Sequence, residues 1–262
     1  MRLSDLPRRK AVKSSFGVID QIIRSWAIVK KDIKIYYSKG PVLLMGVLWP
    51  GFMFIAFAFG RGMPVESLMP GLISVSVFFT CSAIAPVTFP WETQARTLER
   101  LVSAPVAVWT ILFGDMLASA LSGIIISIVP IVIALIIGAK IIDPLTLVVA
   151  IIFGSICFST MSLLLSCPPV ASPAPIQMLG TLIKFPLMFI SGVFLPLSQL
   201  PTAARIVANI SPLTYFTDLA RYATGGQNFY SVPVNLGAIS FFTLISWIIA
   251  VKLHNRTLPM RL

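Results

Sequence analysis

Long uncharged stretches dominate the chain and define its predicted elements. A bilayer core about 30 Å thick is crossed by about 20 helical residues, and several uncharged stretches reach that length. One of them, Pro144–Ile183, is long enough for two crossings and is divided by prolines between residues 168 and 175. We therefore predict an all-α membrane protein with six transmembrane helices. Their approximate bounds are residues 40–60, 67–91, 113–139, 144–167, 175–195 and 234–251.

The composition excludes several protein classes. Of the 262 residues, 57% are hydrophobic and only 11% are charged, and the mean hydropathy is +0.93. A soluble domain carries about 25% charged residues, so an ordinary soluble enzyme, a disordered protein and a coiled coil are excluded. The three cysteines lie inside apolar runs and match neither a disulfide framework nor a paired-cysteine metal site. We expect no metal site and no cofactor in this chain.

The basic residues indicate how the chain is oriented in the membrane. There are 20 Lys and Arg against 9 Asp and Glu, and ten of the basic residues precede Gly40. Cytoplasmic segments of membrane proteins carry an excess of Lys and Arg, so six spans with both termini in the cytoplasm fit this distribution best. We expect a multi-pass protein of the cell membrane. Nothing resembles a nucleic-acid-binding motif or platform, so nucleic acid is not an expected partner.

The basic segment of residues 1–39 contains an amphipathic pattern. Large apolar residues recur every three or four positions at Ile22, Trp26, Val29 and Ile33, while Lys and Arg occupy other faces. Such a helix is expected to lie at the membrane interface, in contact with lipid. The pattern leaves two interpretations open, a plain membrane anchor or a docking site for a cytosolic partner.

The loop over residues 92–105 concentrates charge in a chain that is otherwise poor in it. Glu92 and Arg96 are four residues apart, a favourable helical pair, Glu99 and Arg100 follow, and Pro105 ends the helix. On spacing alone, this segment could be a solvated turn. Its charges also suit a short helix that a protein outside the membrane could grip.

The region over residues 196–233 is neither a span nor a polar loop. Prolines separate two short, partly apolar segments, Thr202–Ile210 and Leu213–Ala223, each too short to cross a bilayer. We predict short re-entrant helices between the fifth and sixth spans. Asp218 and Arg221 are three residues apart on one helical face, and we expect a structural ion pair between them.

Two charges fall within or next to predicted spans. An ammonium near the middle of a span costs about 2.5–3.5 kcal/mol on insertion scales, and Lys184 is placed there. One hypothesis is that Lys184 pairs with Asp115 inside the bundle or faces a conduit. The alternative is that its ammonium reaches back to the cytosolic headgroups.

Three blocks of sequence resemble the permease subunits of type 2 ATP-binding-cassette exporters, which export drugs, polysaccharides and lipo-oligosaccharides. The first begins at Glu92 and continues with TLERL at 97–101 and SAP at 103–105. The second is FPLMFISGVFLPLSQLP at 185–201. The third is SPLTYF at 211–216, followed by Asp218 and Arg221. The blocks occur in the family's order and cover most of the chain, together with the amphipathic segment.

The resemblance implies a division of labour between chains. The loop is similar to a coupling helix that sits in a cleft of an ABC ATP-binding subunit. That subunit would bind ATP-Mg, because this sequence has no G-x-x-x-x-G-K-[ST] phosphate loop. A second permease copy, as a homodimer, is implied as well. The residues implied in coupling are Glu92, Arg96, Thr97, Leu98, Glu99, Arg100 and Pro105. Those implied in an outer gate are Gly192, Pro196, Pro201, Pro212, Asp218 and Arg221.

Two other functions are less well supported by the residues. An ion-coupled secondary transporter usually places carboxylates or histidines near the middle of the membrane, whereas the single histidine, His254, follows the last predicted span. A membrane-embedded enzyme would need a nucleophile with its base, or metal ligands, and the sequence supplies neither. The favoured hypothesis is a non-catalytic permease subunit of an ATP-driven exporter.

Overall fold

The computed structural model describes residues 17–37, 40, 44–61, 65–103, 106–136, 138–170 and 172–258. Throughout these ranges the chain forms helices joined by turns. The α-helices are α1 (Val18–Asp32), α3 (Trp49–Arg61), α4 (Val65–Cys81), α5 (Ala85–Gln94), α6 (Leu98–Ser103), α7 (Val108–Ile136), α8 (Pro144–Leu165), α9 (Pro173–Ile190), α10 (Thr202–Ala208), α11 (Pro212–Ala223) and α12 (Val232–Thr257). Three short turns of other helical types are η2 (Ile33–Tyr37), η3 (Leu44–Leu48) and η4 (Leu197–Gln199).

Five stretches of the described chain are long and apolar enough to cross a membrane. They are Ser67–Gln94, Val108–Ile136, Pro144–Leu165, Pro173–Ile190 and Val232–Thr257. These match five of the six predicted spans, with shifts of a few residues at their ends. The remaining prediction, residues 40–60, coincides with an apolar helix over Gly46–Phe57, which is shorter than the 20 or so residues that a crossing needs.

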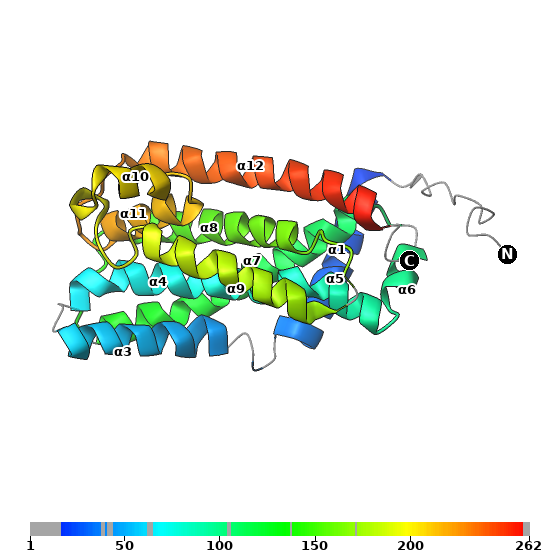
Figure 1. The fold of residues 1–262 in the computed structure, drawn as a ribbon, viewed down its shortest axis with the longest axis horizontal. Helices are drawn as coiled ribbons and strands as arrows, with labels where there is room; N and C mark the ends of the chain where they lie inside the picture. The colour runs from blue at the N-terminus through cyan, green and yellow to red at the C-terminus, as the bar shows by residue number, and fades with distance from the viewer. Residues whose placement is uncertain are drawn as a thin grey trace.

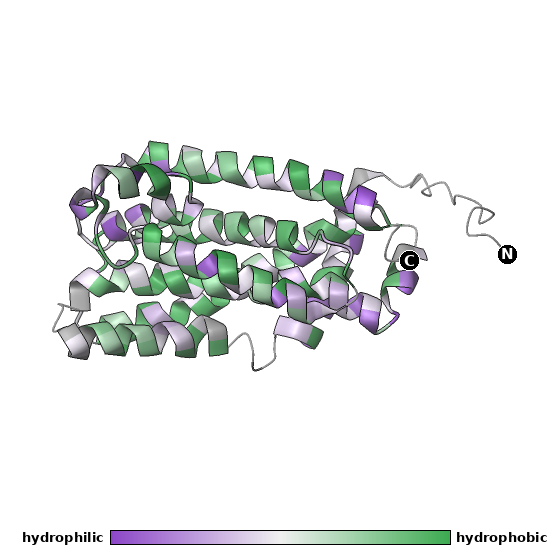
Figure 2. Ribbon diagram, in the orientation of Figure 1, coloured by the Kyte–Doolittle hydropathy of each residue, from purple (hydrophilic) through white to green (hydrophobic). Residues whose placement is uncertain are grey.

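The long helices run side by side, and the short ones gather at the two ends of the bundle. In Figure 1, α4, α7, α8, α9 and α12 follow the long axis. Helices α10 and α11 lie at one end, and α1, α5 and α6 lie towards the other, where α12 also finishes. Figure 2 shows apolar residues along the body and polar ones gathered towards the ends. The bundle therefore has two polar ends separated by an apolar body.

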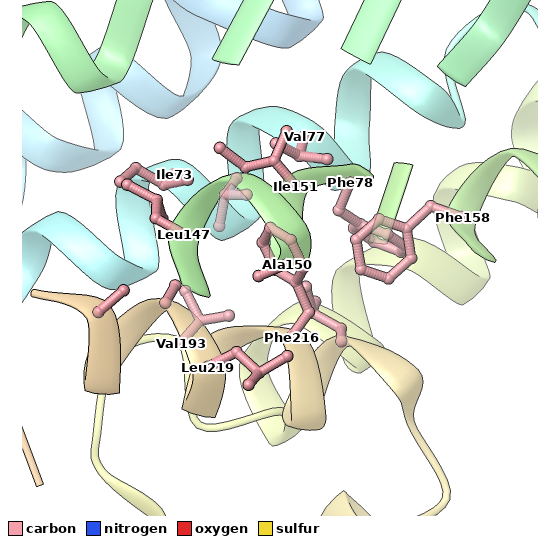
Figure 3. Packing of buried hydrophobic residues seen from close by; sticks show 14 of the residues in the cluster. Ile73, Val77, Phe78, Leu147, Ala150, Ile151, Phe158, Val193, Phe216 and Leu219 are labelled. Atoms are coloured by element: carbon pink, nitrogen blue, oxygen red, sulfur yellow. The ribbon is translucent and has the colours of Figure 1, made fainter. Parts of the chain in front are cut away.

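The prediction of two short helices between the last two spans is confirmed by α10 and α11. Helix α11 is enclosed by the bundle, and its Phe216 is fully buried against α8 and α4 (Figure 3). The rings of Phe216 and Phe158 are 5.4 Å apart, and those of Phe158 and Phe78 are 5.1 Å apart, both edge to face. Aromatic pairs favour this geometry. Protein therefore covers α11.

Small residues allow the helices to approach closely. The stripe Ser119, Gly123 and Ser127 predicts close packing of α7, and the structure places Ser119 Oγ 2.8 Å from Ser159 Oγ on α8. A Cβ atom at Gly123 would lie 2.2 Å from Cys81 Sγ on α4. Such stripes bring helices together in the absence of a hydrophobic force between them.

The close contact between α8 and α11 depends on the absence of a side chain at Gly154. A Cβ atom there would lie 2.3 Å from Cδ2 of Phe216, whose ring is fixed by its neighbours. We expect Gly154→Ala to lower the free energy of unfolding by about 1–3 kcal/mol because the ring must move. Thermal unfolding of the purified protein in detergent measures this effect.

Gly237 on α12 provides a matched control. A Cβ atom at this position meets nothing within 4 Å, and alanine is favoured over glycine in a helix by about 0.5–1 kcal/mol. Gly237→Ala should therefore keep or slightly raise the melting temperature. Equal stability of the two variants would contradict the packing described for α8 and α11.

Candidate functional site

The charged loop folds as two helices rather than one. Helix α5 ends at Gln94, and α6 begins at Leu98. The turn between them is closed by Thr97 N, which donates to Glu92 O at 2.9 Å. Arg96 has a φ of 54°, the left-handed conformation that non-glycine residues rarely adopt. The predicted helical pair between Glu92 and Arg96 is therefore wrong, because Arg96 has already left the helix.

Helix α6 is anchored by one side chain and presents the others outward. Leu98 is buried in a cluster that includes Phe89 and Leu112. The neighbouring residues of the predicted coupling set, Arg96, Thr97, Glu99 and Arg100, are all exposed. Pro105, which belongs to the same prediction, lies outside the described residues. The result is a short helix that is fixed to the bundle and displays charges of both signs.

Behind this surface, one lysine lies among three carboxyl groups contributed by three helices. Lys31 Nζ of α1 donates to Glu92 Oε1 of α5 and lies 3.1 Å from Asp32 Oδ1. Asp115 of α7 lies close enough to interact electrostatically with Lys31 and Asp32. Asp32, Glu92 and Asp115 are all at least 96% buried. We call these four residues the joint, because they connect α1, the stem of the charged loop and α7.

Charge in the joint strongly favours the ammonium form of Lys31. Burial by itself lowers the pKa of this lysine, but Asp115, Asp32 and Glu92 together raise it above its ordinary value. Within the described part of the chain, neither carboxyl oxygen of Asp115 accepts a hydrogen bond. Lys31 is therefore a positive charge that compensates for this group of acids. Nearby, Tyr36 stacks on Trp91 with ring centroids 5.4 Å apart, and burial followed by the Glu92 charge raises the pKa of Tyr36 to about 12.

The amphipathic segment forms α1, and the bundle covers more of it than the pattern predicts. Of the predicted lipid-facing stripe, Ile22 and Trp26 are about half exposed, whereas Val29 is buried and Ile33 half-buried. The close approach is made at Gly114 of α7, where a Cβ atom would lie 2.7 Å from Ile28 Cβ.

Polar contacts also hold α1 against the bundle. Gln21 Oε1 accepts a hydrogen bond from Thr110 Oγ1 at 2.6 Å, and Gln21, Ser25 and Asp32 are all buried. A buried face that is polar cannot be recognised from a hydropathy pattern. Because the bundle covers this side of α1 and Val29 is buried, the prediction that Val29 faces lipid is wrong.

Lys184 and Asp115 do not form the predicted pair. Lys184 Nζ on α9 donates to the backbone oxygen of Ser82 at 2.6 Å, while Asp115 lies in the joint. The alternative, in which the ammonium reaches the headgroups, is not found either, since Lys184 is only 5% exposed. Its partner is a backbone carbonyl at a break in a helix, which no spacing rule identifies.

Asp218 and Arg221 are both buried, but their hydrogen bonds go to other groups rather than to each other. Asp218 accepts hydrogen bonds from Phe229 N at 2.8 Å, from Tyr230 N at 2.9 Å and from the Asn235 side chain at 2.9 Å. Arg221 donates to Gly192 O at 2.8 Å. The salt bridges found among the described residues do not include this pair, so the predicted ion pair is wrong.

The remaining residues of the predicted outer gate lie at turns and helix starts. Gly192 has a φ of 75°, in the region that favours glycine, and bends the chain directly after α9. Pro196 and Pro201 precede η4 and α10, and Pro212 is the first residue of α11. Proline suits the first helical position, as at Pro212, because its fixed φ angle matches the helix. Pro196 and Pro201 are the N-cap residues of their helices. Each residue therefore has a clear structural role.

His254 is a residue that the sequence reasoning misplaced. It lies inside α12, buried, with Nε2 2.9 Å from Ser166 Oγ and Nδ1 3.3 Å from Cys167 Sγ. The last uncharged run ends at Val251, whereas the helix continues to Thr257. Among the described residues, no group of three or more His, Cys, Asp or Glu side chains is arranged to hold a metal ion.

Comparison with known proteins gives a consistent family assignment. The family model for "ABC-2 type transporter" matches residues 24–224. Nodulation protein J of Neorhizobium galegae is 24% identical over 253 residues, which cover 88% of this chain and 93% of that protein. The inner membrane transport permease YadH of Escherichia coli (strain K12) is 24% identical over 202 residues, covering 75% and 77% of the two chains. A shorter match, 31% identical over 78 residues and 30% of each chain, is to nodulation protein J of Rhizobium leguminosarum bv. viciae.

The matched region extends from within α1 through the charged loop and the helices α7, α8 and α9 to the end of α11. It contains all three sequence blocks on which the resemblance rests. The expectation of a permease family is thus confirmed over well more than half of the chain. The chain belongs to the ABC-2 type transporter family and is a membrane permease of the ABC transporter type.

Proposed function

We propose that this permease forms the translocation pathway of an ATP-driven exporter and is powered by a separate ABC ATP-binding subunit that binds ATP-Mg. The observation that carries the proposal is the geometry of the charged loop. Glu99 and Arg100 are exposed on α6, which Leu98 anchors, and Arg96 is exposed in the turn before it. Glu92, at the base of the loop, is tied to Lys31 of α1. A force applied to the exposed charges would therefore reach both α1 and the membrane helices.

We also propose a membrane topology for this permease. Residues 40–60, including the short apolar helix of this region, are proposed as the first of six spans, with both termini in the cytoplasm and the chain in the cell membrane. Ile22 and Trp26 of α1 present apolar surface that suits an interfacial position among lipids. Helices α10 and α11, at the opposite end of the bundle from α6 (Figure 1), are proposed as the re-entrant outer region.

A second copy of the chain is proposed to complete the pathway. Helix α9 is exposed along one side, with Met178 at 77%, Leu182 at 71% and Phe189 at 56% exposure. In Figure 1 it lies on the surface of the bundle facing the viewer. Two such faces in one membrane would enclose an apolar conduit in a homodimer.

The test is whether the permease retains an ABC ATP-binding subunit. Candidate ABC ATP-binding subunits are co-purified with the wild-type chain and with a charge-reversed variant, Glu99→Lys with Arg100→Glu, in lipid nanodiscs. We expect the wild type to retain the subunit and the reversed variant to lose at least about tenfold in affinity, because like charges then face each other. Equal retention of the subunit by both chains would overturn the proposed contact.

A second arm addresses the alternative power source. The wild-type chain alone, reconstituted in vesicles, should accumulate no cargo in response to a proton or sodium gradient. Uphill transport under those conditions would favour an ion-coupled secondary transporter.

A further inference from the structure

The second membrane stretch is broken in the middle. Ser67–Gln94 is one candidate span, but it consists of α4, which ends at Cys81, and α5, which begins at Ala85. Residues 82–84 form a turn, and Pro86, four residues after Ser82, has no N–H to donate to the Ser82 carbonyl. A break leaves carbonyl oxygens at the end of α4 without their helical partners, and inside a membrane other groups must satisfy them.

Three other helices supply those partners. Cys81 O accepts hydrogen bonds from Ser119 Oγ of α7 at 2.6 Å and from Ser162 Oγ of α8 at 3.3 Å. Ser82 O accepts from Lys184 Nζ of α9 at 2.6 Å. All of these side chains are buried, so the break is a built feature of the bundle.

Among these donors, Lys184 is the charged one. A hydroxyl group is enough to satisfy a carbonyl, as Ser119 and Ser162 show at the adjacent position. A buried ammonium is costly within a membrane, and what it adds is attraction to the negative end of the α4 dipole. Carbonyl ends of interrupted helices attract cations in transporters, and here the cation is tethered to α9. Its long, flexible stem would keep this attraction while the helices shift.

The break lies between the body of α4 and the charged loop. Helix α5 leads through the Arg96 turn into the exposed charges of α6, so the break separates that charged end from the body of α4. Near the break, α9 also makes an apolar contact: Phe185 packs edge to face on Phe79 of α4 at 5.6 Å between ring centroids.

We propose that Lys184 is a positioning residue for transport: its ammonium ties the break between α4 and α5 to α9, so that a displacement of the charged loop moves α9. This inference rests on the proposed function, in which a partner pulls on the loop. According to this inference, α9, the helix with the exposed apolar face, is the helix that moves when nucleotide binds.

The test follows α9 while ATP is hydrolysed. Met178→Cys places an exposed thiol on α9, whereas the three native cysteines are buried. The rate at which a maleimide modifies this thiol is measured in the complex with its ATP-binding subunit, with and without MgATP and vanadate. In the wild-type background we expect nucleotide to change the rate about threefold or more, since the two states differ in the exposure of α9.

Variants of Lys184 then separate coupling from folding. Lys184→Met should keep ATP hydrolysis while the response of the thiol disappears, and Lys184→Arg should restore the response because it keeps the charge. Ser162→Ala removes a hydrogen bond at the same break from another helix, and should leave the response intact. If Lys184→Met does not fold, Lys184→Gln, which keeps a donor without the charge, takes its place and should also lose the response.

The outcomes are distinguishable. A full nucleotide response in Lys184→Met, or in Lys184→Gln, overturns the inference while leaving the proposed function in place. A wild-type complex without ATP hydrolysis rejects the proposed function, and this inference with it. Loss of the response in Ser162→Ala as well would show that the break, and not the charge, matters, and would also overturn the inference.

Discussion

Replacing Lys31 by methionine should lower the free energy of unfolding by about 3 kcal/mol, the lower part of the range for breaking a buried ion pair. The substitution leaves the buried carboxylate of Glu92 without its partner. It also removes the charge that offsets Asp32 and Asp115. The lysine side chain is itself 28% exposed, which is why the lower part of the range applies. Thermal and denaturant unfolding in detergent measure the loss.

Two further variants show whether the effect belongs to the joint. Lys30→Met removes the same charge from an exposed position on the same helix and should change stability by less than about 0.5 kcal/mol. Lys31→Met combined with Glu92→Gln should recover part of the loss, because the unpaired carboxylate is gone. Additive effects of the two substitutions would contradict a direct pair.

The dependence on pH has a definite sign. Because the pKa of Lys31 is raised in the folded protein, its contribution to stability is fully present below the ordinary value of 10.5 and is lost as pH rises through the folded value. The difference in stability between wild type and Lys31→Met should therefore persist from neutral pH to about pH 10. A difference that disappears between pH 7 and 9 would contradict this electrostatic account.

The second large effect is expected at Asp218. Its carboxylate holds the turn after α11 through two backbone N–H groups and holds the start of α12 through Asn235. Asp218→Asn removes the charge and turns an amide NH₂ towards these donors. Hydrogen bonds to charged groups contribute about 1.5–3 kcal/mol each, so we expect a loss of about 3 kcal/mol or more in thermal unfolding.

An exposed aspartate provides the control for this substitution. Asp20 lies in the first turn of α1 and is solvent-exposed, so Asp20→Asn should leave the melting temperature almost unchanged. Limited proteolysis should also cut Asp218→Asn, but not the control, within residues 224–231. A melting temperature equal to that of the wild type for Asp218→Asn would show that the three hydrogen bonds do not hold the outer region together.

Hydropathy, together with proline and helix-capping residues, predicts the long helices well. The fourth span is predicted over residues 144–167, and α8 occupies Pro144–Leu165, because Asp143 caps the helix by accepting from Thr146 N at 3.1 Å and Pro144 suits its first position. The short outer helices are likewise marked by their prolines. These signals are local in sequence, so a single chain reveals them.

The contacts that define the candidate site are not local. Lys31 and Glu92 are 61 positions apart, and no pattern within either segment indicates the other. Lys184 binds the Ser82 carbonyl, which lacks a helical donor because Pro86, four residues later, has no N–H. The proline marks the break in the sequence, but nothing local identifies Lys184 as its partner. The partners at the break, on α7, α8 and α9, are brought together only once the helices are packed.

The exposed charges of α6 provide the most direct test of the central claim, that an ATP-binding partner docks at this end of the bundle. A photoreactive amino acid is placed at Arg100 on α6 or at Ile206 on α10, which is 63% exposed near the opposite end (Figure 1). After illumination of intact membranes, the cross-linked peptides are identified by mass spectrometry. The account predicts peptides of an ABC ATP-binding protein from position 100 and none from position 206. Capture of that protein from position 206, or only lipid adducts from position 100, would contradict it.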